Sequence, residues 1–254
     1  AGTGARSALR HAPGASPEVQ ESGADASAAS GPESIPPCAP SAPLMAAPPA
    51  SLRSAAHRPL PESCAAAVEA TAQVCRAAWG RGLLAGFNGN ASCLVPLQEH
   101  EGTCLITRSG AAKSGLTGQD FALLALHGGL LAGAAPSSEA GMHLAIYAAC
   151  PETRAVLHTH PPCLLALGLL VPPERRLDLP LYEAAAYRAC LAFVPALPPG
   201  SAELAEAVAN AARTHPAIWL ENHGLVAHGH SLHQALALME ELEQLAAVQI
   251  QTLQ

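Results

Sequence analysis

The stretch 136–160 begins with Pro-Ser-Ser-Glu-Ala-Gly-Met-His and ends with Val-Leu-His-Thr-His. Its middle has a helical pattern, and its end is a short apolar run that predicts a β-strand over 154–160. Successive side chains of a strand point to opposite faces, so His158 and His160 share one face. Two imidazoles side by side, with the carboxylate of Glu139 upstream, favour a metal site.

A third histidine of such a site has to come from elsewhere in the chain. His223 is the best candidate, because it lies between the apolar segments 217–220 and 224–227, which predict a bent pair of strands. His143 follows Glu139 by four residues on the same helix face, and a core position is favoured for it over a supporting role at the site. Six further histidines fall at loops or helix starts and are expected on the surface: His100, His127, His215, His228, His230 and His233.

Ser137 or Ser138 is expected to cap a helix that runs to Ala149, because short hydroxyl side chains accept hydrogen bonds from the first free N–H groups of a helix. Glu139 would lie in the first turn, where the helix dipole favours an acid. The dipole alone explains an acid at this position. Two interpretations of Glu139 therefore stay open, a helix-start acid or a group of the site.

Composition divides the chain near residue 60. Residues 1–60 consist largely of Ala, Pro, Ser and Gly, with hardly a large apolar residue. Such a segment cannot bury enough apolar surface to offset the entropy of ordering it. We therefore predict a disordered extension over 1–60 and one folded domain over 61–254. The extension lacks the apolar core of a secretion signal, and it carries acids, unlike an organelle transit peptide.

Charge and cysteine usage restrict the class of protein. The whole net charge of −7 lies on the predicted domain, and an acidic domain with few aromatic residues is a poor candidate for binding nucleic acid. No apolar run reaches the length that spans a membrane, so a soluble protein is expected. The eight cysteines include no C-x-x-C pair and mostly sit in apolar stretches, which favours buried thiols in a reducing cytoplasm over disulfides or zinc ligands.

The remaining pattern predicts a mixture of helices and strands. Helices are expected over 61–79, up to Ala149, up to Leu170, over 201–213 with Ser201 as cap, and from Ser231 onward. Strands are expected over 91–95, 103–107, 121–126, 154–160, 177–181, 191–194, 217–220 and 224–227. Short connections between several of these strands indicate an α/β fold with an antiparallel or mixed sheet and helices on its faces. Neither the phosphate-loop motif G-x-x-x-x-G-K nor the dinucleotide-binding motif G-x-G-x-x-G occurs between a strand and a helix, so a nucleotide-dependent reaction is unsupported.

Four blocks together resemble the class II aldolase/adducin family, in the order and at the separations typical of it. They are Gly89-Asn90-Ala91-Ser92, Ile106-Thr107-Arg108-Ser109-Gly110, Pro136-Ser137-Ser138-Glu139, and His158-Thr159-His160 followed by Asn222-His223-Gly224. The similarity runs from about Pro61 to the last residue. It implies a central, mostly antiparallel sheet flanked by helices, and a homotetramer with active sites between subunits.

The resemblance also implies a chemistry. His158, His160 and His223 are similar to the ligands of a catalytic Zn²⁺ with one open position, as Lewis-acid chemistry requires. The substrate would be a ketose 1-phosphate, cleaved through a metal-stabilised enediolate to dihydroxyacetone phosphate and an aldehyde. Glu139 would be the acid/base that moves the proton at the carbon next to the carbonyl. The family's epimerases are expected to carry Asp at this position, so Glu139 argues against epimerisation.

A phosphate site is implied at two loops of small residues. Hydroxyl and N–H groups at a helix start bind anions readily. The implied phosphate-binding residues are Asn90, Ser109, Gly110, Ser137 and Ser138. Lys113 lies close enough in sequence to assist.

Three departures from the family pattern bear on the substrate. Arg108 stands where the family usually has proline, and Leu181, with Tyr182 one position late, stands where it has a tyrosine that reaches the neighbouring subunit. The chain ends at Gln254, so the family's C-terminal segment, which closes over substrate, is expected to be absent.

Alternative functions from other classes remain at this point. A methylthioribulose-1-phosphate dehydratase-like zinc lyase would use the same enediolate chemistry. A non-catalytic adducin-like interaction module would have no reason to keep three histidines in this arrangement, which ranks it low. A family member with an intact metal site and decayed activity is the fourth interpretation.

Overall fold

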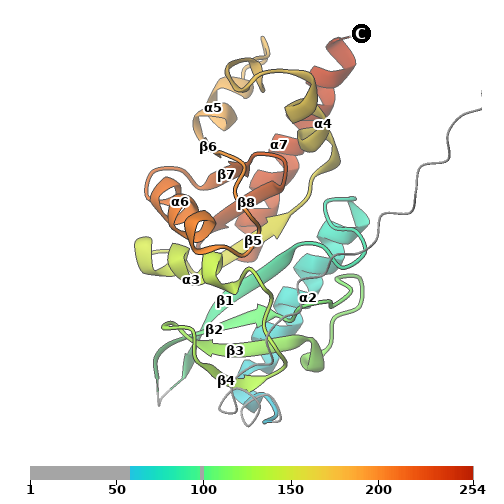
Figure 1. The fold of residues 1–254 in the computed structure, drawn as a ribbon. Helices are drawn as coiled ribbons and strands as arrows, with labels where there is room; N and C mark the ends of the chain where they lie inside the picture. The colour runs from blue at the N-terminus through green and yellow to red at the C-terminus, as the bar shows by residue number, and fades with distance from the viewer. Residues whose placement is uncertain (1–57, 98–99, 254) are drawn as a thin grey trace, which may run out of the picture. The chain divides into compact units, whose positions relative to one another are not determined.

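The computed structural model describes residues 58–97 and 100–253. They contain an eight-stranded sheet in the order β4-β3-β2-β1-β5-β8-β7-β6 (Figure 1). All neighbouring pairs are antiparallel except β6 with β7, which confirms the predicted mixed α/β architecture with a mostly antiparallel sheet. The strands are β1 (Asn90–Leu97), β2 (His100–Thr107), β3 (Phe121–Ala125), β4 (Leu130–Gly133), β5 (Ala155–Thr159), β6 (Leu191–Val194), β7 (Ala217–Leu220) and β8 (Gly224–Gly229).

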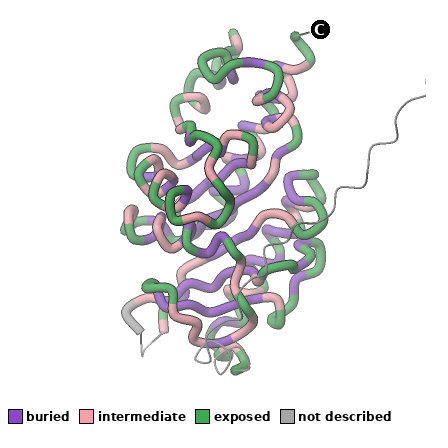
Figure 2. Tube along the Cα trace, viewed as in Figure 1, coloured by how far each residue is buried: buried purple, intermediate pink, exposed green. Residues whose placement is uncertain are grey.

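Helices cover both faces of the sheet (Figure 1), most strand residues are buried (Figure 2), and the buried side chains form two clusters. Successive strand residues alternate between the clusters: Leu105 packs in the cluster that contains the cores of α2, α4 and α7, whereas Ile106 packs in the cluster of α3 and α6. The helices are α2 (Ala65–Gly80), α3 (Ala140–Ala149), α4 (Pro162–Leu170), α5 (Ala184–Ala189), α6 (Ala202–Ala212) and α7 (Leu232–Thr252), with short 3₁₀ turns η1 (Glu62–Cys64), η2 (Gly118–Asp120) and η3 (Pro173–Arg175).

Local signals locate the last two long helices correctly. Ser201 Oγ accepts a hydrogen bond from the N–H of Leu204 at the start of α6, and Ser231 Oγ accepts one from Gln234 at the start of α7. Each hydroxyl satisfies one of the N–H groups that a helix start leaves free. An apolar stripe along the last helix is buried, namely Leu232, Leu236, Met239, Leu242 and Leu245.

The expected strand over 177–181 is wrong. This segment is irregular backbone after η3, and Leu177 adopts a left-handed φ of 55° that no strand residue has. The side chain of Gln249 on α7 accepts a hydrogen bond from the N–H of Leu177, and it donates one to the carbonyl of Arg175. The backbone polar groups are thus satisfied by α7 rather than by a neighbouring strand. The short helix α5 and the strand β4 were not predicted.

Two further predictions concern the N-terminal extension and membrane-spanning segments. The extension over 1–60 lies, up to residue 57, outside the described residues, and its disorder stays a prediction. Within the described residues, no helix is both long and apolar enough to cross a membrane.

Two deeply buried thiols should resist alkylation in the folded protein. Burial raises the pKa of Cys75 and of Cys104 to about 12, and both side chains are essentially inaccessible. Because the thiolate is the reactive form, iodoacetamide at pH 8 should leave these two unmodified, while the partly exposed Cys190 reacts. Peptide mapping by mass spectrometry reads the sites, with the unfolded protein as control. Labelling of Cys75 at the rate of Cys190 would contradict the burial.

Candidate metal centre and active site

His158 lies near the end of β5 with its ring held by the neighbouring strand. Its Nδ1 lies 3.0 Å from the carbonyl oxygen of Leu225 on β8, to which it donates. A proton on Nδ1 leaves the lone pair on Nε2, so Nε2 is the atom available to a metal. Strand pairing therefore selects the tautomer of His158 as well as its position.

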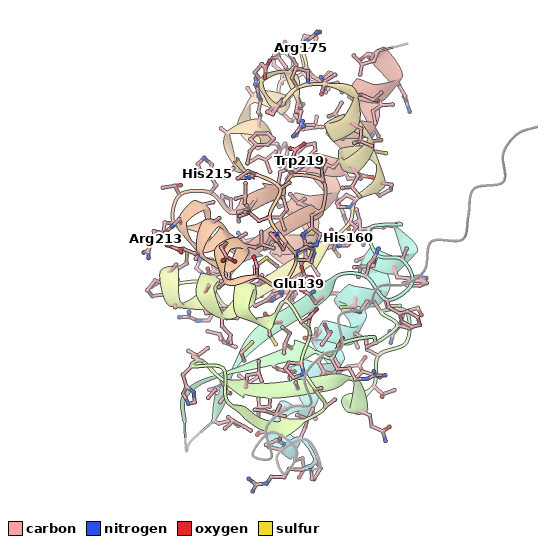
Figure 3. All side chains as sticks on the ribbon, viewed as in Figure 1. Glu139, His160, Arg175, Arg213, His215 and Trp219 are labelled. Atoms are coloured by element: carbon pink, nitrogen blue, oxygen red, sulfur yellow. The ribbon has the colours of Figure 1, made fainter. Side chains whose placement is uncertain are left out.

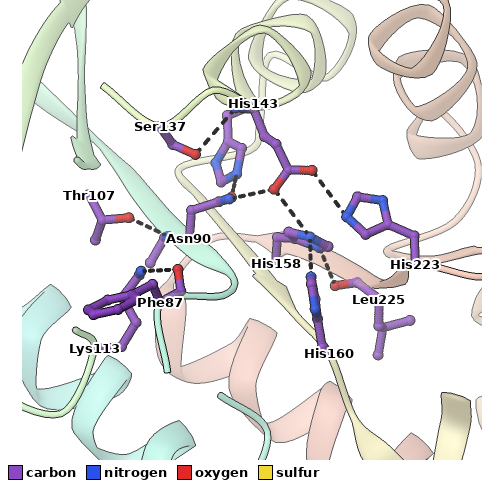
Figure 4. Close-up of polar contacts among 12 residues, drawn as sticks. Phe87, Asn90, Thr107, Lys113, Ser137, His143, His158, His160, His223 and Leu225 are labelled. Atoms are coloured by element: carbon purple, nitrogen blue, oxygen red, sulfur yellow. Dashed lines mark hydrogen bonds and ion pairs between the residues drawn. The ribbon is translucent and has the colours of Figure 1, made fainter. Parts of the chain in front are cut away.

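Three imidazoles from two segments converge at this point (Figure 4). Nε2 of His160 lies 3.1 Å from Nε2 of His158, and the ring centroid of His223 lies 4.8 Å from that of His158. His223 occupies the tight turn between β7 and β8, where Asn222 has a left-handed φ of 59°. Asparagine tolerates this conformation better than most residues. The sequence interpretation named these three histidines, and the structure brings them together.

Glu139 faces the three rings from the start of α3. Its Oε1 lies 3.2 Å from Nε2 of His223, and its Oε2 lies 3.4 Å from Nε2 of His158. Figure 3 shows Glu139 and His160 at the centre of the molecule's described part, with Arg213 and His215 away from them on the α6 side. The four side chains thus form one cluster.

The expected helix cap needs a correction. Glu139 itself is the N-cap residue of α3, because the helix begins at Ala140, and its side chain makes no capping hydrogen bond. Ser137 Oγ instead accepts a hydrogen bond from the N–H of Glu139, at 3.3 Å. Freed from capping, the carboxylate of Glu139 turns toward the histidines.

Ionisation states in the cluster suit cation binding. Burial lowers the pKa of His158 to about 3, against the opposing effect of the Glu139 carboxylate, so the ring is neutral near pH 7. Burial alone would raise the pKa of Glu139, but the rings of His223 and His158 and the amide of Asn90 outweigh it and hold the pKa well below its usual range. Neutral imidazoles and an ionised carboxylate are the forms that coordinate metals.

The donor atoms fit a divalent metal. One ligand atom from each of His158, His160 and His223 lies within 4.8 Å of the others. Ligands bound at about 2.0–2.1 Å in a tetrahedron lie roughly 3.4 Å apart, close to the distances between Nε2 and carboxylate atoms found here. Oε1 of Glu139 is buried and has no hydrogen-bond partner among the described residues. A cation would give this oxygen a bonding partner.

A buried chain of hydrogen bonds supports Glu139 from behind. Nδ2 of Asn90 donates to Oε2 of Glu139 at 2.8 Å, while Oδ1 of Asn90 lies 2.5 Å from Nε2 of His143. Nδ1 of His143 in turn lies 2.7 Å from Oγ of Ser92, which also contacts the hydroxyl of Tyr147. His143 is therefore both a core residue and a support of the site, and the two interpretations offered for it merge.

The register of the strands explains this series of hydrogen bonds. Asn90 on β1 is the direct partner of His158 on β5, so their side chains lie on the same face of the sheet. Burial lowers the pKa of His143 to about 4, which keeps the ring neutral and able to accept one hydrogen bond and donate another. Sequence alone shows the residue types but not this pairing.

A second support, absent from the sequence interpretation, holds the turn that carries His223. The buried guanidinium of Arg176 forms a bidentate pair with Glu221, at 2.5 and 2.9 Å, and lies 4.8 Å from the ring of Trp219. It also donates to the carbonyls of Val171 and Gly168. No sequence signal indicated this contact, because it joins residues 45 positions apart without a motif.

A cavity of about 320 Å³ opens onto the cluster. All the residues predicted to bind phosphate line it, and Glu139, His160 and His223 line it as well. Lys113 and Arg108 also contribute to its wall. The predicted residues are Asn90, Ser109, Gly110, Ser137 and Ser138.

The geometry limits which of these groups are free to bind an anion. The N–H groups of Ser109 and Ser137 already donate to the carbonyls of Ala135 and Thr107. One N–H of the Asn90 amide donates to Glu139 and its oxygen contacts His143, which leaves the second N–H of Asn90. The hydroxyl groups of the serines remain as donors, and Ser137 keeps its O–H because its oxygen only accepts from Glu139.

One of the histidines expected on the surface is buried instead. His228 on β8 is 9% exposed, its Nδ1 lies 2.8 Å from the hydroxyl of Thr153, and its Nε2 donates to the carbonyl of His215. Burial lowers its pKa. Both ring nitrogens are satisfied, so His228 serves the packing of β8 and not the metal cluster.

Comparison with known proteins places this site in a family. Residues 69–250, more than half of the chain, match the family described as Class II Aldolase and Adducin N-terminal domain. The chain belongs to the class II aldolase/adducin family. The blocks of sequence around Asn90, Ser109, Glu139, His158 and His223 all fall inside the matched range.

Curated relatives of this class II aldolase family member include proteins with two different names. A 3-oxo-tetronate 4-phosphate decarboxylase of Haemophilus influenzae is 35% identical over 182 residues, covering 70% of this chain and 84% of the relative. An L-fuculose phosphate aldolase of Methanococcus maripaludis is 32% identical over 174 residues, covering 68% of this chain and 90% of the relative.

Solved structures agree on the fold. YgbL from Klebsiella pneumoniae, described as a putative aldolase/epimerase/decarboxylase, aligns with a TM-score of 0.62 and 32% identity over 71% of this chain and 86% of that one. The L-fuculose-1-phosphate aldolase from Thermus thermophilus aligns with a TM-score of 0.58 and 27% identity, over 73% and 93%. The class II aldolase fold of this chain is thereby established.

Proposed function

We propose that this chain is a zinc-dependent lyase that breaks the bond between the carbon next to the carbonyl (α) and the following carbon (β) of a phosphorylated substrate. The preferred reaction is cleavage of a ketose 1-phosphate to dihydroxyacetone phosphate and an aldehyde. The observation that carries the proposal is the cluster of His158, His160, His223 and Glu139 at the mouth of a cavity lined by serine hydroxyls. An epimerase is not favoured, because Glu139 stands where Asp is expected.

The three histidines would hold the metal through neutral ring nitrogens, with a position left open for substrate. When bound, the metal supplies Lewis acidity that polarises the carbonyl and balances negative charge on its oxygen. Glu139, ionised and buried beside the rings, would take up the proton that the hydroxyl of the departing carbon releases and deliver it to the carbon that loses its bond, and it would move the proton the opposite way in the reverse reaction. The serine hydroxyls of the cavity would hold the phosphate, which fixes the reacting carbon beside Glu139.

A second candidate reaction is decarboxylation of a 3-oxo-tetronate 4-phosphate. The 35% identity to a relative of that name favours it. Loss of carbon dioxide from this 3-oxo acid, followed by proton delivery to the same carbon, also yields dihydroxyacetone phosphate. Both candidates thus need the same retained three-carbon phosphate and the same acid, and they differ only in the departing group.

An assay panel separates the candidates. The purified, zinc-loaded chain is incubated with L-fuculose 1-phosphate and other ketose 1-phosphates, with 3-oxo-tetronate 4-phosphate, and with methylthioribulose 1-phosphate. Dihydroxyacetone phosphate with an aldehyde identifies the aldolase, and dihydroxyacetone phosphate with carbon dioxide identifies the decarboxylase. Dehydration of the third substrate would favour the dehydratase instead.

Metal content is measured on the same preparation. About one zinc per chain is expected. The His158→Ala variant should lose this zinc, because removing one of the three proposed ligands strongly weakens metal binding. The matched control is His230→Ala, on the surface and outside the cluster. If the chain cannot be loaded with metal and cleaves none of the substrates, the proposal is wrong, and a non-catalytic interaction module becomes the favoured function.

Two coarser expectations accompany this function. We propose a homotetramer, as implied by the family resemblance, which sedimentation of the full chain tests. We also propose a cytoplasmic location, because the seven cysteines among the described residues are all free thiols, as in a reducing compartment. A sugar phosphate is the proposed small-molecule partner.

A further inference from the structure

Lys113 is the only lysine in the 254-residue sequence; the other twelve basic residues are arginines. It is 1% exposed and forms part of the wall of the cavity that opens onto the metal cluster. A chain that uses arginine at every other basic position has placed its one compact ammonium group inside its candidate active site. A guanidinium is larger and carries its donors in a rigid fork, so the two side chains are not equivalent there.

Among the described residues, no acid lies close enough to Lys113 to form an ion pair with it. Its ammonium donates to the carbonyls of Ala111, at 2.6 Å, and Phe87, at 3.3 Å (Figure 4). An ammonium carries three N–H donors, so one donor stays without an acceptor in the described part of the chain.

The other cation of the cavity wall is already neutralised. Nε of Arg108 lies 3.0 Å from Oδ1 of Asp120, and the Arg108 side chain is 38% exposed. Asp120 is held in turn by the N–H and hydroxyl of Thr117. The two cations of one cavity therefore differ: Arg108 has an acid partner and solvent, whereas Lys113 has neither within the described ranges 58–97 and 100–253.

A buried, unpaired cation is costly unless a ligand or partner compensates it. Burial lowers the pKa of Lys113, which reflects this cost. The remaining candidate donors of the cavity, the serine hydroxyls and the second N–H of Asn90, are neutral and cannot balance the two negative charges of a phosphate monoester. Unpaired positive charge and neutral donors thus complement each other in one cavity.

We propose that Lys113 is a specificity-determining residue that selects a phosphorylated substrate over its unphosphorylated analogue by supplying the charge that the neutral phosphate donors lack. This inference rests on the proposed function. It assigns the anion selectivity to Lys113 and not to Arg108. The free N–H of the ammonium is the donor available to a phosphate oxygen, while the two carbonyl contacts hold the side chain in place.

A purely supporting role is the competing explanation. The carbonyls of Phe87 and Ala111 belong to two loops that border the cavity, and Lys113 joins them. If this tie were its whole function, its loss would disturb the binding of charged and uncharged ligands equally. Two ligands that differ only in the phosphate therefore separate the explanations.

The experiment measures binding of dihydroxyacetone phosphate and of dihydroxyacetone to the zinc-loaded full chain by calorimetric titration and competition. Lys113→Met should weaken dihydroxyacetone phosphate about 10- to 100-fold, the range for losing a hydrogen bond to a charged group, and leave dihydroxyacetone within about twofold. Lys113→Gln, whose amide can still donate to the carbonyls, should behave the same way and serves if the methionine variant folds poorly. Arg108→Gln, the matched control, should change either affinity by less than about threefold because Asp120 already balances that charge.

Two outcomes would overturn the inference. Equal weakening of both ligands in the Lys113 variants would reduce Lys113 to a loop tie, and unchanged binding of dihydroxyacetone phosphate would remove it from the site. Turnover is read separately on the wild-type chain. Binding that depends on Lys113, without cleavage of any substrate in the panel, would overturn the proposed function and leave the anion selection standing.

Discussion

Glu139→Gln should lower turnover of the substrate that the chain cleaves by about 10²- to 10⁴-fold, the usual contribution of a positioned acid or base. Glutamine matches glutamate in size and can still accept the hydrogen bond from the amide of Asn90, at the 2.8 Å contact. It cannot carry a proton to the reacting carbon. The three histidines keep their positions, so zinc content should stay near one per chain.

The distinguishing result is lost turnover with retained ligand binding. Affinity for dihydroxyacetone phosphate, measured by calorimetry, should change far less than the rate of cleavage, because the phosphate and carbonyl contacts do not involve a proton on Glu139. Glu203→Gln is the matched control, because it is the same substitution at an exposed residue in the first turn of α6. A Glu139→Gln variant that cleaves substrate at near the wild-type rate would assign the proton transfer to another group.

The periodic parts of the fold could be predicted from the sequence. The alternation that places Leu105 and Ile106 in different clusters, and the hydroxyl caps of α6 and α7, are local features that a single chain segment carries. The segment 177–181 could not be predicted, because the N–H of Leu177 bonds to the side chain of Gln249 on α7 instead of to a neighbouring strand. A contact across 72 residues leaves no mark on local periodicity.

The residues of the candidate site could be named from the sequence, but their roles toward one another could not. The blocks that carry His158 and Asn90 give residue types, whereas their direct pairing across β1 and β5 depends on strand register. That register turns the Asn90 side chain toward Glu139 and away from a purely phosphate-binding role. The contact of Arg176 with Glu221, and the unpaired state of Lys113, likewise depend on which partners the fold brings near.

Gly224→Ala should weaken zinc binding by about 10- to 100-fold, as expected when the packing that orients metal ligands is disturbed. Gly224 begins β8 immediately after His223, and its Cα packs against the end of β5. A methyl group built there would lie 2.5 Å from the carbonyl oxygen of Thr159, 2.9 Å from Cδ2 of His160 and 3.1 Å from Cε1 of His158. The closest of these atoms belongs to the backbone, so a rotation of a side chain cannot relieve the clash.

The clash therefore has to separate β5 from β8 at the point where both histidine-bearing segments meet. We expect a loss of about 1–3 kcal/mol in the free energy of unfolding of the metal-free chain, as for other overpacked sites, in addition to the weaker zinc binding. Gly141→Ala is the matched control: Gly141 lies in α3, a Cβ there would meet nothing within 4 Å, and alanine favours a helix over glycine. Zinc titration with a chromophoric competitor and denaturant unfolding read the two effects. Wild-type zinc affinity in Gly224→Ala would show that the close contact between these strands does not set the positions of the three histidines.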